Sequence, residues 1–397
     1  MNFKTTKADL QEALTLTRGS VRTDNPVDTV YESVMFEACQ DGVWVNATDG
    51  TIWSRILIGA KVKGWDPVMI KSSNLSEIVS HLDDGDLEIE FDGRQAILSS
   101  GSYVARFGAA NAMEFPACPK PSHDRFTIQA DKFVSMVRAV EGSAETKADR
   151  PYLQGVNFSL YDGNLEVVAT DGYRMAISRC AIASHTAERG SLDKTLHENR
   201  SGRVAPLYTP LKAMGTCGSR MARQWLSLAS VRPLDGNVSF GFQDGWGFMV
   251  GESAQIVGLL PDQRFPDFRS IPMFPKSDEP SSVIILNRKI LARAVKRVCA
   301  VGAKLKGSVG LTIETHESGA VWLIARGGGK DARDRVDGRM LTKLHDGFIT
   351  RRIGGDYLRQ ALDNLSSDEV KMVIPDHEEK PVCVSDGMTE HWLMPRK

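Results

Sequence analysis

The tetrapeptide Ala-Thr-Asp-Gly occurs twice in this sequence, at residues 47–50 and 169–172. Each copy follows a short apolar run and precedes a further strand-like stretch. A second signature comes after each copy, Glu114-Phe115-Pro116 after the first and Arg264-Phe265-Pro266 after the second. Because the two signatures recur together and far apart, the repeating unit is expected to be a whole domain and not a hairpin. The sequence therefore predicts a chain built from repeats.

Two polar segments that contain several prolines, 116–122 and 272–280, divide the 397 residues into parts of similar length. Proline has no N–H to donate and a fixed φ, so neither segment can continue a sheet, and both are interpreted as linkers. We predict three domains, at residues 1–118, 124–272 and 281–397. Residues from about 183 to 203 are polar and unpatterned, and we interpret them as a surface loop inserted into the second domain.

Each predicted domain has the same order of elements. A short strand is followed by a helix, then by strand-like alternations bounded by Asp-Gly turns, and a second helix comes midway. This order predicts an α+β fold, with two helices on one side of a largely antiparallel sheet in each domain. The opening helices are predicted at 7–18, 131–140 and 287–301, and the second helices at 73–82, from 209–214 onwards, and at 355–365.

The composition is that of a soluble globular chain, with 42% hydrophobic and 25% charged residues. The six cysteines lie far apart without a Cys-x-x-Cys pair, and the eight histidines are dispersed. We therefore expect no disulfide framework, no metal site and no cofactor. The N-terminus is too charged for a secretory signal, and no run of about 18 apolar residues occurs. A cytoplasmic protein without membrane contact is predicted.

The segments 152–156 and 168–175, together with Arg264-Phe265-Pro266-Asp267-Phe268 and the terminal Leu393-Met394-Pro395, resemble the bacterial sliding clamp, the β subunit of DNA polymerase III. The resemblance implies a six-domain dimeric ring, a homodimer that encircles double-stranded DNA without sequence specificity. It also implies a processivity factor for DNA replication that is not an enzyme. The implied protein partners are the DNA polymerase III catalytic subunit, the clamp loader and other clamp-motif proteins.

Basic residues recur on the predicted helices in all three domains. Because the net charge is −1, a polyanion must be met by locally gathered lysine and arginine. Phosphate contacts of this kind position a protein on DNA without reading its sequence. The alternative interpretation is that these residues form solvated helix faces. The residues expected to face DNA are Arg22, Lys132, Arg138, Arg150, Tyr152, Lys212, Arg220, Arg288, Arg293, Lys296 and Arg297.

The resemblance also implies a peptide-binding pocket on the second and third domains. An apolar groove suits the Leu and Phe anchors of a short linear motif, and burying two such side chains contributes roughly 3 to 6 kcal/mol before ordering costs. The alternative is that the same residues are ordinary inter-domain core. The implied pocket residues are Leu153, Thr170, Gly172, Tyr173, Arg174, Met175, Pro266, Ile271, Leu305, Tyr357, Leu393, Met394 and Pro395.

Two features depart from the family pattern. Ser270 stands where a second arginine is usual, and the chain ends in Arg396-Lys397 instead of an apolar residue. A diverged clamp, or one from a phage or other mobile element, would fit these departures. Ring closure would place Phe107 of one chain and Cys299 of the other near the dimer interface.

An enzyme remains the alternative function. Asp49 and Asp171 could serve as acid and base in a hydrolase or lyase. Each, however, stands before a glycine at a turn, where aspartate is favoured because it bonds its own backbone. The segment Gly327-Gly328-Gly329-Lys330 lacks the spacing of a phosphate loop and is interpreted as a hairpin tip.

Overall fold

The computed structural model describes residues 1–23, 29–121, 125–147, 149–161, 164–186, 212–262, 264–271, 280–302, 304–305, 308–316, 318–327, 329–342 and 349–396. The chain forms two compact units. The first comprises Met1–Val134, Ile182–Leu207 and Arg220–Asp262, and the second comprises Ser135–Ala181, Tyr208–Ser219 and Gln263–Lys397. The helices are α1 (Lys7–Thr17), α2 (Ser72–His81), α3 (Ala130–Glu141), α4 (Ser219–Val231), α5 (Arg288–Cys299) and α6 (Gly355–Asn364), with short 3-10 turns η1 (Arg18–Ser20), η2 (Pro151–Leu153) and η3 (Phe268–Ser270).

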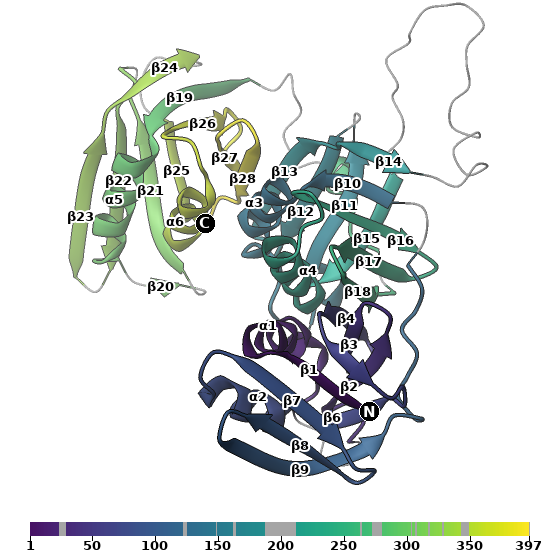
Figure 1. Ribbon diagram of the computed structural model, residues 1–397. Helices are drawn as coiled ribbons and strands as arrows, with labels where there is room; N and C mark the ends of the chain where they lie inside the picture. The colour runs from purple at the N-terminus through teal and green to yellow at the C-terminus, as the bar shows by residue number, and fades with distance from the viewer. Residues whose placement is uncertain are drawn as a thin grey trace, which may run out of the picture. The chain divides into compact units, whose positions relative to one another are not determined.

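The first unit is organised by one long antiparallel sheet (Figure 1). Strand β18 pairs with β4, which joins the end of one repeat to the middle of the one before it. In spatial order the strands are β14 (Ser184–Thr186), β10 (Arg125–Gln129), β16 (Asn237–Gln243), β17 (Trp246–Gly251), β18 (Ala254–Leu259), β4 (Ile52–Ile58), β3 (Gly42–Thr48), β2 (Ser33–Cys39), β6 (Val68–Lys71), β9 (Tyr103–Asn111), β8 (Gln95–Ser100), β7 (Asp86–Phe91), β1 (Asn2–Thr6) and β5 (Lys61–Lys63).

The second unit contains two antiparallel sheets. Here β13 pairs with β28, the counterpart of the β4–β18 pair. The larger sheet runs β15 (Lys212–Gly218), β11 (Gly155–Tyr161), β12 (Asn164–Thr170), β13 (Arg174–Ala181), β28 (Thr389–Leu393), β27 (Val382–Ser385), β26 (Glu369–Pro375), β19 (Ser281–Asn287) and β24 (Gly338–Thr342). The smaller one runs β20 (Lys304–Leu305), β21 (Ser308–Thr315), β22 (Val321–Gly327) and β23 (Lys330–Val336), with β25 (Ile349–Gly354) paired to β21.

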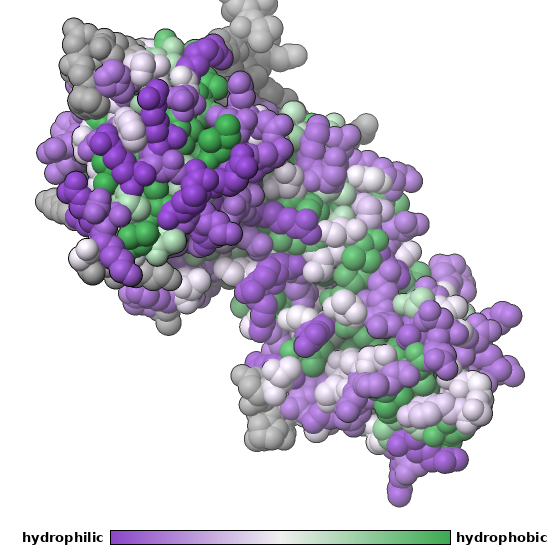
Figure 2. All heavy atoms as spheres, turned by 90° about the vertical axis from the view of Figure 1, so that its left-hand side faces the viewer, coloured by the Kyte–Doolittle hydropathy of each residue, from purple (hydrophilic) through white to green (hydrophobic). Residues whose placement is uncertain are grey.

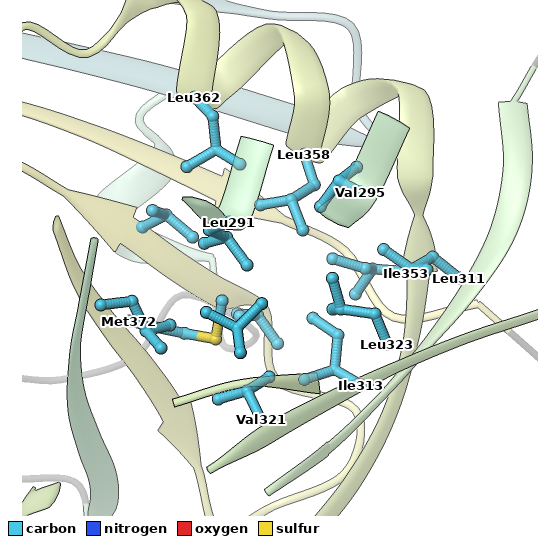
Figure 3. Close-up of a cluster of buried hydrophobic side chains, with 14 of the residues drawn as sticks. Leu291, Val295, Leu311, Ile313, Val321, Leu323, Ile353, Leu358, Leu362 and Met372 are labelled. Carbon is cyan, nitrogen blue, oxygen red and sulfur yellow. The ribbon is translucent and has the colours of Figure 1, made fainter. Parts of the chain in front are cut away.

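Helices form where a polar cap precedes an apolar stripe. The Thr6 side chain accepts a hydrogen bond from the Asp9 N–H at the start of α1, and Asn287 accepts one from the Ile290 N–H at the start of α5. Leu291 and Val295 of α5 are buried, and they point into the same core as the α6 side chains Leu358 and Leu362 (Figure 3). This core lies between the two helices and the sheets beneath them.

The repeated order of strand, helix, strands and helix is confirmed, since β1–α1, β10–α3 and β19–α5 each open a repeat and α2, α4 and α6 follow. One helix prediction was wrong. Residues 212–218 form strand β15 and not the start of a helix, and α4 begins at Ser219. Gly215 and Gly218 disfavour a helix by about 1 kcal/mol each, whereas β15 pairs with β11 along its length except for one register shift at Phe158/Ser159. On α5, Ile290 is 45% exposed, although the adjacent Leu291 is buried.

The three-domain boundaries stay a prediction. The strands of the second predicted domain are divided, with β10, β14 and β16–β18 in the first unit and β11–β13 and β15 in the second. At the predicted inserted loop, Ser184–Thr186 form strand β14, paired with β10, while 187–203 lie outside the described residues. Most of the 272–280 linker also lies outside them. The predicted hairpin tip at 327–330 does connect two paired strands, β22 and β23.

Hydrophilic side chains cover most of the face in Figure 2, with smaller hydrophobic groups between them. Within the described ranges, none of the helices has the length and hydropathy needed to cross a bilayer. The six cysteines are all free thiols. No group of three or more His, Cys, Asp or Glu side chains suited to a metal ion occurs among the described residues.

Candidate functional site

The second repeated turn joins β12 to β13 and forms one side of a pocket in the second unit. Asp171 Oδ1 accepts hydrogen bonds from the N–H groups of Tyr173 at 2.9 Å and Arg174 at 3.0 Å. The Thr170 hydroxyl accepts from the Gly172 N–H and donates to the Arg174 carbonyl at 2.6 Å. Gly172 has a φ of 82°, a conformation that glycine adopts without strain. The turn is therefore rigidly built from its own side chains.

Arg174 connects this turn to two helices. Its Nε donates to Asp171 Oδ2 at 3.1 Å, and its terminal nitrogens donate to the Gln360 side chain on α6 and to the Gly142 carbonyl just after α3. The guanidinium also lies 4.6 Å from the centre of the Tyr357 ring. Because the side chain is only 13% exposed and has four neighbours to satisfy it, Arg174 acts mainly as a structural anchor.

The pocket beside the turn has a volume of about 350 Å³. Most of its wall is apolar, and it is built from η2, the turn, the segment after Arg264, and β28. Eight of the residues implied by the family resemblance line it, and these are Leu153, Thr170, Gly172, Arg174, Met175, Pro266, Ile271 and Met394. Arg150 and Tyr152, which we expected to face DNA, also lie in this wall.

The other implied pocket residues are placed differently. Leu393 is 1% exposed and belongs to the hydrophobic core, so it does not line the pocket. Tyr173 is 49% exposed beside the wall, and Pro395 is half-buried next to Met394. Tyr357 lies behind Arg174, with Arg396 on its ring at 5.5 Å, and burial raises the pKa of its hydroxyl. The Leu305 side chain lies outside the described residues.

Three wall residues were missing from the predicted set: Phe268, Pro381 and Trp392. Alternation along β28 could have identified one of them. Side chains two apart on a strand share a face, so Trp392 and Met394 point to the pocket while Leu393 points to the core. Phe268 lies in the Phe-Pro-Asp-Phe motif, where η3 begins at the capping Asp267. Pro381 had no sequence signal that we can identify.

A buried ion network supports two of these walls from behind. Glu166 on β12 is fully buried, and its carboxylate accepts hydrogen bonds from Arg179 at 2.8 Å and from Arg269 of η3. Arg179 also donates to Glu390 at 3.0 Å, and Glu390 accepts from the indole N–H of Trp392 at 3.1 Å. Phe268 and Trp392 are thus both linked to Glu166. Phe268 is linked through its neighbour Arg269, and Trp392 is linked through Glu390 and Arg179.

The first repeated turn is built like the second. Asp49 Oδ1 accepts the N–H groups of Thr51 and Ile52, both at 2.8 Å, and Asp49 Oδ2 pairs with Arg220 at the start of α4. The turn interpretation of both aspartates is therefore confirmed. Asp49 and Asp171 have their oxygens occupied by backbone N–H groups and arginines, which leaves neither placed as an acid or base for the hydrolase or lyase alternative.

The predicted DNA-facing residues fall into two groups. Lys132 and Arg138 of α3, and Arg293, Lys296 and Arg297 of α5, are exposed. The other group has structural contacts: Arg22 lies 4.9 Å from the Tyr31 ring, Arg220 pairs with Asp49, and Arg288 donates to the carbonyls of Leu362 and Ser367. Lys212 lies on strand β15 and not on a helix. Arg297 also pairs with Asp334 at 2.6 Å.

Phe107 and Cys299, predicted near a dimer interface, lie on β9 and at the end of α5. Phe107 is 9% exposed, and burial raises the pKa of the Cys299 thiol to about 11. Within the described residues, β9 from Tyr103 to Phe107 pairs only with β8, and β23 pairs only with β22. Each unit therefore has a strand edge with unpaired backbone groups.

Two family models match the sequence. The model of the DNA polymerase III beta subunit N-terminal domain matches residues 1–119, and that of its central domain matches 127–193. A beta sliding clamp homolog, GriR, from Streptomyces muensis is 25% identical and aligns over 92% of this chain and 89% of its own length. The chain is a diverged member of the sliding-clamp family.

Other relatives of this clamp-family chain match over shorter regions. The beta sliding clamp of Chlamydia trachomatis is 28% identical over 178 residues, which is 44% of this chain and 42% of the relative. The chain thus spans less than half of that relative's length. The crystal structure of the DNA polymerase sliding clamp from Bacillus subtilis has a TM-score of 0.84 and 16% identity, covering 100% of this chain and 99% of that one. At this identity the structural likeness shows the fold alone, which here extends over the whole chain.

Proposed function

We propose that this protein is a DNA sliding clamp, a ring-shaped processivity factor that encircles duplex DNA and tethers a replicative polymerase and other partners by their short peptide motifs. The observation that carries the proposal is the apolar pocket of about 350 Å³ whose wall contains eight of the thirteen residues implied by the family resemblance. Its role is non-enzymatic and its place is the cytoplasm, where replication proteins act.

The pocket suits the hydrophobic anchors of a linear motif. Met175, Phe268, Trp392 and Met394 offer apolar area, and Ile271 is 44% exposed at the rim. Burying two anchor side chains contributes roughly 3 to 6 kcal/mol, from which ordering of the peptide subtracts. The resulting affinity is micromolar, which allows one partner to be exchanged for another. The DNA polymerase III catalytic subunit and the clamp loader are the proposed partners.

Duplex DNA is held by exposed basic helix residues without sequence readout. Arg293 and Lys296 lie on the exposed face of α5, while Lys132 and Arg138 lie on that of α3. Such contacts are with phosphates, so binding weakens as salt rises. A closed ring needs only weak contacts because topology prevents the DNA from leaving. Ring closure is proposed to use the free edges of β9 and β23 in a head-to-tail homodimer.

Peptide binding is tested with the Ile271→Asp variant and a peptide carrying Leu and Phe anchors, with affinity measured by fluorescence anisotropy. An aspartate at the apolar rim should weaken binding at least tenfold, because it removes buried area and adds a charge that must be desolvated. The matched control is Leu341→Asp on β24, which changes a side chain of similar exposure outside the pocket. Equal affinities of the two variants would contradict the pocket assignment.

Encirclement is tested by incubating the full chain with a nicked circular plasmid and separating bound protein by gel filtration. Retention on the circle should persist in high salt and disappear when the plasmid is linearised. Light scattering should give twice the chain mass of 43.6 kDa. A monomer that stays equally well on linear and circular DNA would show ordinary surface binding instead.

A further inference from the structure

A second pocket, of about 310 Å³, lies in the first unit beside the first copy of the repeated turn. Its base is the sheet of β2, β3 and β4, on which Met35, Asn46 and Arg55 are neighbours in register. The segment 115–118, which contains the second signature of the first repeat, forms the opposite wall. All of its lining residues belong to the first unit.

This pocket shares two positions with the candidate peptide pocket of the next repeat. Trp53 follows Asp49 by four positions, just as Met175 follows Asp171. Trp53 on β4 pairs with Val257 on β18, and Met175 on β13 pairs with Trp392 on β28. Phe115-Pro116 contributes to one wall as Pro266 does to the other. The two pockets therefore share a strand position and a proline of the second signature, and they have similar volumes.

The chemistry of the second pocket is polar. Arg55 donates to Glu37 at 2.8 Å, and its guanidinium carbon lies 4.5 Å from the centre of the Trp44 ring. The Arg55 Nε and the Trp53 indole nitrogen are both buried and have no hydrogen-bond partner within the described part of the chain. Trp53 itself is only 8% exposed. An unmet buried donor costs about 1–3 kcal/mol, and because Trp53 and Arg55 both line the pocket, an acceptor that reached either nitrogen would offset this cost.

Glu37 narrows the choice of acceptor. Its carboxylate already offsets the Arg55 charge, so an incoming carboxylate would lie beside Glu37 and be repelled. A neutral amide fits both sides, since its carbonyl oxygen can accept from the arginine or the indole while its N–H donates to Glu37. The side chains of Glu37 and Arg55 are 43% and 30% exposed, which leaves both within reach of such a group.

We propose that this pocket binds a short peptide segment through the side-chain amide of a glutamine or asparagine. Phe115 and Pro116 cover the aliphatic part of that side chain, and Arg55 and Glu37 bind its amide. The site is additional to the candidate peptide pocket and is independent of the proposed clamp function. It differs from that pocket in selecting a polar anchor in place of Leu and Phe.

The test uses the full chain labelled with 5-fluorotryptophan, in which the seven tryptophans are followed by ¹⁹F NMR. Trp53→Phe and Trp392→Phe serve only to assign the resonance of each pocket. The probes are N-acetylglutamine methylamide and N-acetylglutamate methylamide, which share a shape and differ by one charge. The glutamine probe should shift the Trp53 resonance in a saturable way and leave Trp392 unchanged, and the glutamate probe should bind at least tenfold more weakly.

Three variants complete the test. Arg55→Met should weaken binding of the glutamine probe at least tenfold. Glu37→Gln should bring the affinities of the two probes within about threefold of each other. Lys4→Met, which removes an exposed ion pair with Glu88 on the same unit, is the control and should change neither. The proposal is overturned if no probe shifts Trp53 saturably, or if the glutamate probe binds the unaltered protein as tightly as the glutamine probe. Because Trp392 reports the other pocket separately, failure here leaves the proposed clamp function untouched.

Discussion

At the first repeated turn Asp49 accepts the N–H groups of residues two and three positions ahead, and at the second turn Asp171 does the same. The two aspartates differ in the arginine that their other carboxylate oxygen, Oδ2, binds. Asp49 binds Arg220 of helix α4, whereas Asp171 binds Arg174 of its own turn. The pockets beside the turns also differ, with Glu37 and Arg55 in one wall and Phe268 and Met394 in the other. The same turn geometry thus stands beside two pockets of different polarity.

The largest contrast is expected between the carboxylates behind the two pockets. Glu166→Gln should lower the free energy of unfolding by about 3–5 kcal/mol, because Glu166 is fully buried and a neutral amide no longer offsets the charges of Arg179 and Arg269. Glu37→Gln should cost about 0–1 kcal/mol, since that ion pair is partly exposed. Urea unfolding of both variants measures the two losses in free energy of unfolding. Similar losses would mean that the two networks carry equal structural weight.

A pH dependence should distinguish the paired strands beside the pockets. His391 on β28 is buried, and this burial lowers its pKa from 6.5 to about 4. The unfolded chain therefore binds the proton more tightly than the native one, so stability is complete above pH 6.5 and falls as the pH drops towards 4. The equivalent strand β18 contains no titratable side chain.

Between pH 7 and pH 5 this histidine should cost about 2 kcal/mol of stability. Comparing urea unfolding of the unaltered protein with that of His391→Phe at both pH values isolates the contribution. The variant should lose about 2 kcal/mol less on acidification. An identical loss in both proteins would show that another group is responsible.

The smallest predicted difference concerns the turns themselves. Asp171→Ala should weaken binding of a Leu- and Phe-containing peptide about tenfold, because it releases the N–H groups that fix the pocket edge and frees Arg174. Asp49→Ala should change that affinity less than twofold, since Asp49 lies on the first unit. Anisotropy titrations of both variants decide the matter. Equal effects would mean that turn loss acts through general destabilisation.

Much of this fold is readable from local chemistry. The recurring order of strand and helix identified the opening helices, two of which the structure shows to be capped by Thr6 and Asn287, and the repeated turn identified the repeats. The helix predicted around Lys212 was wrong because this segment pairs with β11, a long-range interaction that no local sequence pattern indicates. The polar insert and the second linker lie largely outside the described residues.

The site was predictable where a motif places residues and less so where packing does. The Thr170–Met175 motif lies in the pocket wall as expected. Leu393 and Trp392 were interchanged because the family resemblance does not say which face of β28 each residue occupies. Arg288 was predicted to face DNA because it is charged. The sequence does not show that its guanidinium donates to the carbonyls of Ser367 and Leu362. The polar pocket beside Arg55 became visible only when the register of β2, β3 and β4 was known.

The four contacts of Arg174 also bear on how this chain can evolve. A lysine could not reproduce them, because a single ammonium group lacks the planar fork that reaches Asp171, Gln360 and the Gly142 carbonyl together. Changes at that position must therefore be accompanied by changes on two helices, which makes them rare. Ile271, exposed at the rim, is under no such restriction. New partner preferences are expected to arise at the rim of the pocket, while its frame is inherited unchanged.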